Sequence, residues 1–251
     1  REGAVASCTG ICARGVEDAT SSPTDVREQA TLVLASLASA PQSQPRFDKS
    51  STIAALTGTL QAEETQVREA AALALLNFST SRAGADMIVA CSQMENVQTI
   101  KIMVQALIEP SALVSLYLVS ALGNICRYAE GTELALDAGI VAKLVEMLDA
   151  SPTSDMEIPL GSPIPGTPAG TRLQTLNTMW NTGNHPRGKK DLIEQDTVSV
   201  ITAALDDSSA DVRRCASGAL MALSVDEGGK NAIMEQSLEQ LPRLLLDDDS
   251  S

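Results

Sequence analysis

Chemistry that needs a histidine has a single candidate in this chain of 251 residues, His185. A hydrolase with a serine or cysteine nucleophile needs a neighbouring base, which is most often histidine. His185 lies between Asn184 and Pro186, in a sequence typical of a turn that opens a helix. We interpret His185 as an exposed turn residue, and we predict no catalytic residue and no enzymatic activity.

The five cysteines could bind a metal ion or form disulfides, but their spacing favours neither. Cys8 and Cys12 are one helical turn apart, which would suit two ligands on one face. A structural zinc ion usually takes four ligands, and the chain offers no second cysteine pair. Residues 228–230 also lack the pattern of a phosphate-binding loop. We therefore expect no metal site and no cofactor, and the odd cysteine count favours a reducing, cytoplasmic location.

Paired carboxylates occur at Glu63-Glu64, at Asp206-Asp207 and in the run at 247–249. Two carboxylates can act as acid and base, so these pairs are also candidates for chemistry. They fall at turns next to runs of helical period, where acidic and hydroxyl side chains cap the first turn and meet the positive end of the helix dipole. We interpret them as capping residues.

The charge of the chain limits its partners, because 18 basic and 32 acidic residues give a net charge of −14. Surfaces that bind nucleic acid or anionic membranes are basic, so we expect neither partner. The local basic run at 187–190 is interpreted as the solvated start of a helix. No apolar run approaches the ~20 residues of a membrane-spanning helix, so we expect no such segment.

The elements that position these residues recur along the chain at a spacing of about 41 residues, a period typical of a stack of helical units. Val26, Val67 and Val114 occupy equivalent positions in three of the recurring stretches. Aromatic residues make up only 2% of the chain, so aliphatic and small side chains must form the core, which suits close helix packing better than sheets. The repeated stretches are 25–30, 66–71, 113–118 and 211–216.

One unit shows the pattern of the repeat best. Helices are predicted at 82–93, 97–107 and 113–128, and the third of them is apolar on nearly all sides. Shorter helices are predicted next at 131–138 and 140–148. The glycine between them, Gly139, suits the left-handed residue that often follows a helix. Each unit therefore consists of a short, a medium and a long buried helix.

A stretch rich in proline and glycine at 150–170 interrupts the period. The third helix is predicted to resume at Thr171, and the interval from Val114 to Thr171 is longer than one repeat. We predict a loop insertion that cannot form helix, which leaves repeats at 1–149, the first one partial, and at 171–251, the last one incomplete.

Three residues of this insertion each precede a proline and are candidate phosphorylation sites. They are Ser151, Ser162 and Thr167.

The run at 130–148 resembles the first two helices of an armadillo repeat, and the run at 67–79 resembles its third helix. The resemblance covers about residues 24–246. It implies an all-α, right-handed armadillo-type superhelical solenoid of three-helix repeats. It also implies that the third helices line a concave groove in which a segment of a partner protein binds.

Three asparagines match a residue that fixes the backbone of the bound peptide in nuclear-import receptors of this family: Asn77, Asn124 and Asn181. We keep them as candidate partner-groove residues, with local capping of the helix end as the alternative. The positions that carry tryptophan in those receptors are here Leu73, Ser120 and Asn177. Without the slots that those rings form for lysine stems, we expect no binding of basic import signals by that mechanism.

Residues 212–223 and 227–233 resemble armadillo proteins of the radial spoke of cilia and flagella. The resemblance implies a non-enzymatic protein–protein interaction scaffold in a large assembly such as the axonemal radial spoke. The alternative is a soluble cytosolic adaptor or a small-GTPase regulator of armadillo type. In the first case the protein would lie in a cilium or flagellum, and in the second in the cytoplasm.

Overall fold

The computed structural model describes residues 2–17, 24–40, 49–150 and 168–237, and every regular element in these ranges is a helix. The chain divides into two compact units, Arg1–Ile125 and Cys126–Ser251. Unit 1 contains α1 (Glu2–Glu17), α2 (Thr24–Ala38), α3 (Lys49–Thr59), α4 (Thr65–Ser79), α5 (Arg82–Ser92), α6 (Thr99–Gln105) and α7 (Ala112–Ile125). Unit 2 contains α8 (Ala129–Asp137), α9 (Ile140–Ala150), α10 (Pro168–Gly183), α11 (Pro186–Glu194), α12 (Thr197–Ala203), η2 (Ala204–Asp206), α13 (Ala210–Leu223) and α14 (Glu227–Ser237).

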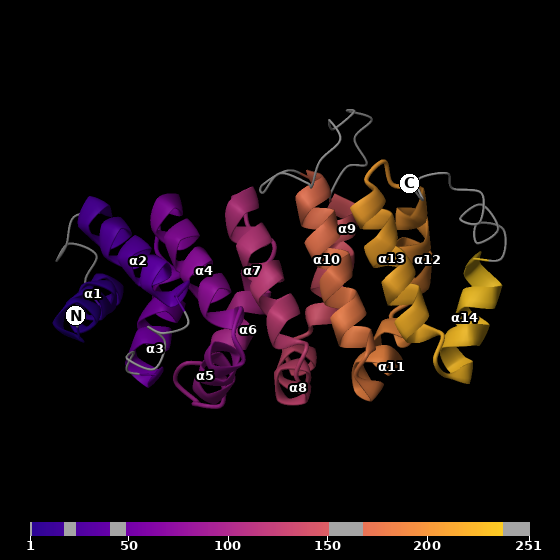
Figure 1. The fold of residues 1–251 in the computed structure, drawn as a ribbon, viewed down its shortest axis with the longest axis horizontal. Coiled ribbons are helices and arrows are strands. Elements are labelled where there is room, and N and C mark those ends of the chain that lie inside the picture. Colours follow the sequence, from indigo (N-terminus) through magenta and orange to yellow (C-terminus); the bar gives the residue numbers. More distant parts are fainter. Residues whose placement is uncertain (1, 18–23, 41–48, 151–167, 238–251) are drawn as a thin grey trace. The chain divides into compact units, whose positions relative to one another are not determined.

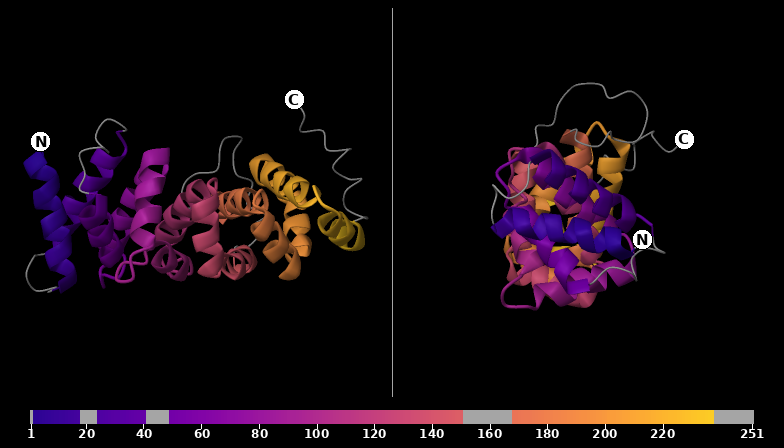
Figure 2. Two further views of the ribbon diagram at one scale, coloured as in Figure 1. Left: turned by 90° about the horizontal axis from the view of Figure 1, so that it is seen from below. Right: turned by 90° about the vertical axis from the view of Figure 1, so that its left-hand side faces the viewer.

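The long third helices of the repeats are α2, α4, α7, α10 and α13 (Figure 1). In unit 1, α4 packs between α2 and α7, and in unit 2, α10 packs against α13. Within each unit the helices follow one another in chain order, as the colours show in Figure 2. The three-helix repeat predicted from the sequence is therefore confirmed.

Small and aliphatic side chains fill the interior of these stacks, as the composition predicts. In α4, Ala71 and Ala74 are fully buried beside Leu75 and Phe78. Alanine lets neighbouring backbones approach closely, and the larger side chains fill the remaining space. None of the helices that the structure describes is long and apolar enough to cross a membrane.

Glycine brings the short first helix of a repeat against the end of the preceding third helix. A Cβ atom at Gly84 would lie 1.8 Å from the carbonyl oxygen of Phe78. A Cβ atom at Gly188 would lie 2.2 Å from the carbonyl oxygen of Thr182. A Cβ atom at Gly229 would lie 1.8 Å from the carbonyl oxygen of Leu223. No larger residue fits at these contacts without a shift of the backbone.

The carboxylates before the third helices do not act as the predicted caps. Glu64 occupies the residue before α4, but its side chain makes no cap hydrogen bond. Instead it accepts hydrogen bonds from Arg27 and from the Thr24 hydroxyl. Asp207 pairs with Arg172 and accepts the backbone N–H of Ser209. The capping interpretation is wrong at Glu64 and Asp207 because a buried arginine of the preceding third helix lies within reach; residues 247–249 lie outside the described ranges.

Several predicted boundaries also differ from the structure, most of them by one to three residues. Helix α7 ends at Ile125 rather than at residue 128, because Tyr128 is extended (φ −122°, ψ 137°) and directly precedes α8. Both edges of the predicted insertion are helical, since α9 includes Ala150 and α10 begins at Pro168. Proline is compatible with a first helical turn, where its missing N–H has no partner in the helix. Gly139 has the expected left-handed conformation, with φ 79°.

Residues 151–167 lie outside the described part of the chain. The predicted loop is therefore untested over those residues. The candidate phosphorylation sites Ser151, Ser162 and Thr167 lie there too and stay predictions.

Candidate functional site

The third helices α4, α7, α10 and α13 each present one accessible stripe, and we name these stripes together the third-helix surface. Apart from the adjacent Leu76 and Asn77, its residues on a helix are spaced three or four apart, which places them on one face of that helix. They are half-buried or exposed, whereas most of the positions between them are buried. The surface consists of Leu73, Leu76 and Asn77 of α4, Tyr117, Ser120 and Asn124 of α7, Gln174, Asn177 and Asn181 of α10, and Arg214, Ser217 and Met221 of α13.

The asparagines of unit 1 bind the neighbouring third helix. The Nδ2 atom of Asn77 donates to the carbonyl oxygen of Ala35 on α2 at 2.9 Å. The Nδ2 atom of Asn124 donates to the Ser79 hydroxyl on α4 at 3.1 Å. A carboxamide has two N–H donors and an acceptor oxygen, so one such bond leaves further hydrogen-bonding capacity on each side chain.

The positions that align with the receptor tryptophans carry no aromatic side chain, but a tryptophan lies nearby in unit 2. Trp180 of α10 is half-buried against Gly218 of α13. A Cβ atom at Gly218 would lie 2.6 Å from carbons of the indole ring. Gly218 aligns with Leu73, so the ring of Trp180 fills space that a side chain at that aligned position would need. Sequence reasoning missed this contact, because it joins residues of two different repeats.

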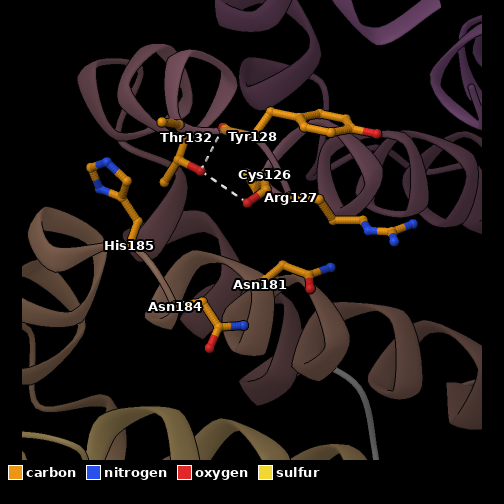
Figure 3. Close-up of a pocket in the computed structure, with 8 residues that line it drawn as sticks. Cys126, Arg127, Tyr128, Thr132, Asn181, Asn184 and His185 are labelled. Atoms are coloured by element: carbon orange, nitrogen blue, oxygen red, sulfur yellow. Dashed lines mark hydrogen bonds between the residues drawn. The ribbon is translucent and has the colours of Figure 1, made fainter. Parts of the chain in front are cut away.

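A pocket of about 270 Å³ opens in unit 2 where the C-terminal end of α10 meets the start of α8 (Figure 3). It is lined by Cys126, Arg127, Tyr128, Ala129, Thr132, Asn181, Asn184 and His185. Of the three candidate asparagines, Asn181 is thus the one that this pocket includes. The two others lie in unit 1, in the stripes of α4 and α7.

His185 is not the exposed turn residue that the sequence suggests. It does immediately precede α11, as predicted, but only 20% of its side chain is exposed. Its Nε2 atom lies 3.5 Å from Oε1 of Glu133 on α8. Its Nδ1 atom is buried and has no hydrogen-bond partner among the described residues. The interpretation is wrong because α8, distant in sequence, covers the imidazole.

The other reactive groups of the pocket are held in unreactive states. Burial raises the pKa of the Cys126 thiol to about 12, so the sulfur is protonated near neutral pH and is a poor nucleophile. The Thr132 hydroxyl lies 2.9 Å from the carbonyl oxygen of Cys126 and 3.1 Å from that of Tyr128. Its single proton is therefore donated to a backbone carbonyl oxygen. This arrangement suits recognition rather than nucleophilic catalysis.

The basic run at 187–190 is largely paired within the protein. Arg187 lies 2.5 Å from Glu133 and 2.7 Å from Asp137, both on α8. Lys189 is 12% exposed and lies 3.3 Å from Asp226, which precedes α14. The interpretation as a solvated helix start is wrong for these two residues, since they join α11 to its neighbours. Lys190, whose side chain is 70% exposed, fits the interpretation as a solvated residue.

The cysteine pair near the N-terminus offers no cluster of ligands. Cys12 is buried, and its sulfur lies 3.3 Å from the Thr31 hydroxyl. Cys8 is half-buried. No group of three or more histidine, cysteine or acidic side chains suited to a metal ion occurs in the part of the chain that the structure describes.

Comparison with solved structures identifies the fold. No protein-family model and no curated protein matches the sequence. Among solved structures, an engineered protein has a TM-score of 0.77 at 22% identity, over 95% of this chain and 90% of its own. A computationally designed armadillo repeat protein for modular peptide recognition has a TM-score of 0.77 at 18% sequence identity. The match covers 94% of this chain and 92% of that protein. A designed armadillo repeat protein in complex with the peptide (KR)4 has a TM-score of 0.77 at 19% sequence identity. The match covers 94% of this chain and 92% of that protein.

The protein thus has the armadillo fold, an all-α solenoid of three-helix repeats. At these identities the likeness shows the fold alone. No comparison supports the more specific resemblance to radial spoke proteins.

Proposed function

We propose that this protein is a non-enzymatic scaffold that binds an extended segment of a partner protein on the third-helix surface. The observation that carries this proposal is the recurrence of one accessible stripe on each third helix. Within that stripe, Asn77, Asn124 and Asn181 occupy the same position of successive repeats. A surface that repeats along a stack suits a ligand that also repeats, and an extended peptide backbone is such a ligand.

The asparagine side chain suits the peptide backbone chemically. A carboxamide both donates and accepts hydrogen bonds, as a peptide group does. In this proposal, the asparagines bind the backbone of the segment, whereas the residues around them select its side chains. The solved complex of a designed armadillo repeat protein with the peptide (KR)4 supports the proposal, because it shows that a protein of this fold can bind a peptide.

We do not expect this chain to bind a basic peptide such as (KR)4 in the way that import receptors bind basic signals. The aligned positions Leu73, Ser120 and Asn177 cannot stack on lysine stems as indole rings do. The net charge of −14 attracts basic partners at long range, but it supplies no shaped site for them. We therefore propose a partner segment other than a basic import signal.

Photo-crosslinking tests the proposal even while the partner is unidentified. A benzophenone amino acid is placed singly at Ser120, Asn177 or Ser217, which belong to the third-helix surface. Matched controls carry it at Lys101 and Lys190, which are exposed on other helices. We expect each of the first three positions to crosslink to a partner protein. Crosslinks from the two control positions alone would contradict the proposal.

The proposal also concerns whether the scaffold belongs to a large assembly or acts as a free adaptor. Residues 212–223 motivate a structural role in a large assembly such as the radial spoke of cilia and flagella. A soluble cytosolic adaptor or small-GTPase regulator is the alternative. Fractionation separates them: retention in salt-resistant cytoskeletal pellets supports the assembly, and free solubility supports the adaptor.

A further inference from the structure

The pocket of unit 2 has a lining of unusual charge for this protein. Its eight lining residues include one arginine and one histidine but no carboxylate. The whole chain, in contrast, carries 32 acidic and 18 basic residues. At about 270 Å³ it is also slightly smaller than the ~300–1,000 Å³ typical of sites for cofactors and drug-sized ligands. These dimensions suit one or two side chains of a bound peptide.

Arg127 at the edge of this pocket is an arginine without a partner. It is exposed, and it forms neither a hydrogen bond nor an ion pair with any residue that the structure describes. The other arginines with described side chains pair with carboxylates or bond to carbonyl oxygens, as Arg187 and Arg213 do. A guanidinium offers five N–H donors in a planar fork that matches a carboxylate.

The opposite side of the pocket also carries an unmatched polar atom. Nδ1 of His185 is buried without a hydrogen-bond partner among the described residues, whereas Nε2 faces Glu133. Leaving such a buried polar atom without a hydrogen bond is unfavourable. Figure 3 shows the Arg127 guanidinium and the His185 imidazole on opposite sides of the cavity. An occupant that satisfies both must therefore present one polar group to each side of the cavity.

We propose that this pocket binds an acidic side chain of the partner segment, with the carboxylate on Arg127 and the adjoining peptide group toward His185. This inference rests on the proposed function, since the side chain is delivered by a peptide on the third-helix surface. The shared residue Asn181, which belongs to both the surface and the pocket, connects the two.

Other occupants fit the lining less well. A lysine side chain would bring a second cation to Arg127 with no carboxylate in the lining to neutralise it. An apolar side chain would leave both Arg127 and Nδ1 of His185 without partners and remove them from water. A strongly acidic segment is repelled by the net charge of −14. The occupant is therefore a single aspartate or glutamate in an otherwise neutral segment.

NMR titration with three nonapeptides tests the inference. The peptides share the sequence Ser-Ala-Ser-Ala-X-Ala-Ser-Ala-Ser and differ only at X, which is glutamate, glutamine or lysine. We expect the glutamate peptide to bind about three to ten times more tightly than the glutamine peptide, as one solvent-accessible charge-assisted contact provides. The lysine peptide is expected to bind no better than the glutamine peptide.

Variants assign the effect to the pocket. Arg127→Gln should abolish the advantage of glutamate over glutamine, and Arg127→Lys should keep part of it, because the charge remains but the planar fork is lost. Lys190→Gln changes the net charge equally at an exposed position of the same unit and should leave the advantage intact. Circular dichroism melting confirms that each variant is folded.

Equal binding of the glutamate and glutamine peptides would overturn the inference. Equal loss of the glutamate advantage in Arg127→Gln and Lys190→Gln would overturn it too, since net charge alone would then explain the preference. Absence of binding by all three peptides would likewise count against it. The proposed scaffold function is judged separately, by the crosslinks from the third-helix surface.

Discussion

Arg172 and Asp207 form a buried ion pair that joins α10 to the turn before α13, with Nε and Oδ2 2.6 Å apart. The side chains are only 5% and 1% exposed. The same relationship recurs in unit 1, where a third-helix arginine pairs with a carboxylate of the turn before the next third helix. The pairs there are Arg27–Glu64 and Arg68–Glu109. The ion pairs therefore fix the spacing of neighbouring repeats and are structural rather than catalytic.

Removal of one partner should destabilise unit 2 strongly. Asp207→Ala removes the buried carboxylate that faces the Arg172 guanidinium, so we expect a loss of about 3–5 kcal/mol in the free energy of unfolding. Urea denaturation followed by fluorescence measures it, because the only tryptophan of the chain, Trp180, lies on α10.

Two control variants distinguish the effect of a buried charge on stability from the effect of an exposed one. Asp86→Ala removes the partner of Arg82, an exposed pair with side chains 54% and 57% exposed, and should change the stability by no more than about 1 kcal/mol. The double variant Arg172→Met/Asp207→Leu should recover most of the lost stability, because an apolar pair often replaces a buried ion pair without penalty. A loss below about 1 kcal/mol in Asp207→Ala would contradict the structural role.

Gly218 should tolerate no side chain beside Trp180. In Gly218→Ala the new Cβ would lie 2.6 Å from the indole carbons, so the ring must move. We expect a shift of the tryptophan emission maximum and a loss of about 1–3 kcal/mol from overpacking. In the matched control Gly183→Ala, the new Cβ has its nearest neighbours at 3.5 Å, and the emission should not change. An unchanged emission in Gly218→Ala would mean that the ring is not held there.

The stability of unit 1 should depend on pH through Glu64. Hydrogen bonds from its own backbone N–H and from the Thr24 hydroxyl lower the pKa of this carboxyl below its ordinary value of 4.5. A carboxyl with a lowered pKa stabilises the folded state above its ordinary value, and that contribution is lost as the pH falls through the folded-state value.

Glu64→Gln should therefore lower the stability at neutral pH, and the difference from the original protein should shrink as the pH is lowered from about 5 to about 3. Urea denaturation followed by circular dichroism measures this at each pH. Glu63→Gln, at the neighbouring exposed residue, is the control, because it removes the same charge and leaves Glu64 in place. A difference that stays constant with pH would show that the charge of Glu64 is not the cause.

The cysteines should differ widely in reactivity. Burial raises the pKa of Cys126 to about 12 from an ordinary 9.0, which lowers its thiolate fraction near neutral pH about a thousandfold. Cys8 is the only cysteine that is not fully buried. Alkylation with iodoacetamide, followed by peptide mass spectrometry, should label Cys8 first in the folded protein and all five cysteines at similar rates in urea. Equally fast labelling of Cys126 in the folded protein would contradict the packing around it.

The sequence predicts those features that local pattern determines. The apolar period finds the third helices, and Gly139 ends α8 as its conformational freedom suggests. Glycine provides a second repeating signal, because one glycine follows the start of four of the five third helices at a constant interval along the chain. These glycines are Gly84, Gly131, Gly188 and Gly229, which follow Val67, Val114, Thr171 and Val212 in turn. Glycines that recur with the repeat indicate a close approach of backbones, which the structure shows at three of the four.

Contacts between repeats could not be read from the sequence. Glu64 and Asp207 stand where capping residues commonly stand, and only the packing of the preceding third helix brings an arginine to each. His185 has the sequence context of an exposed turn, and its burial depends on α8, which lies far earlier in the chain. Local sequence determines the helices, but the site depends on which helices become neighbours.

The asparagines make observed contacts between helices and proposed contacts with a partner, and an experiment must separate the two. Asn124 donates to Ser79, so its replacement changes a contact between helices as well as the proposed contact with a partner. Ser79→Ala removes the same interhelical bond and leaves Asn124 in place. It serves as the control, for which we expect the affinity for a partner segment to stay the same.

The affinity of the crosslinked partner segment for the triple variant Asn77→Ala/Asn124→Ala/Asn181→Ala tests the central claim most directly. Each asparagine is expected to contribute one hydrogen bond of about 0.5–1.5 kcal/mol to the peptide backbone. The account therefore predicts a loss of affinity of at least about tenfold in a variant whose melting shows that it is folded. An unchanged affinity would contradict the claim that the third-helix surface binds its partner through these asparagines.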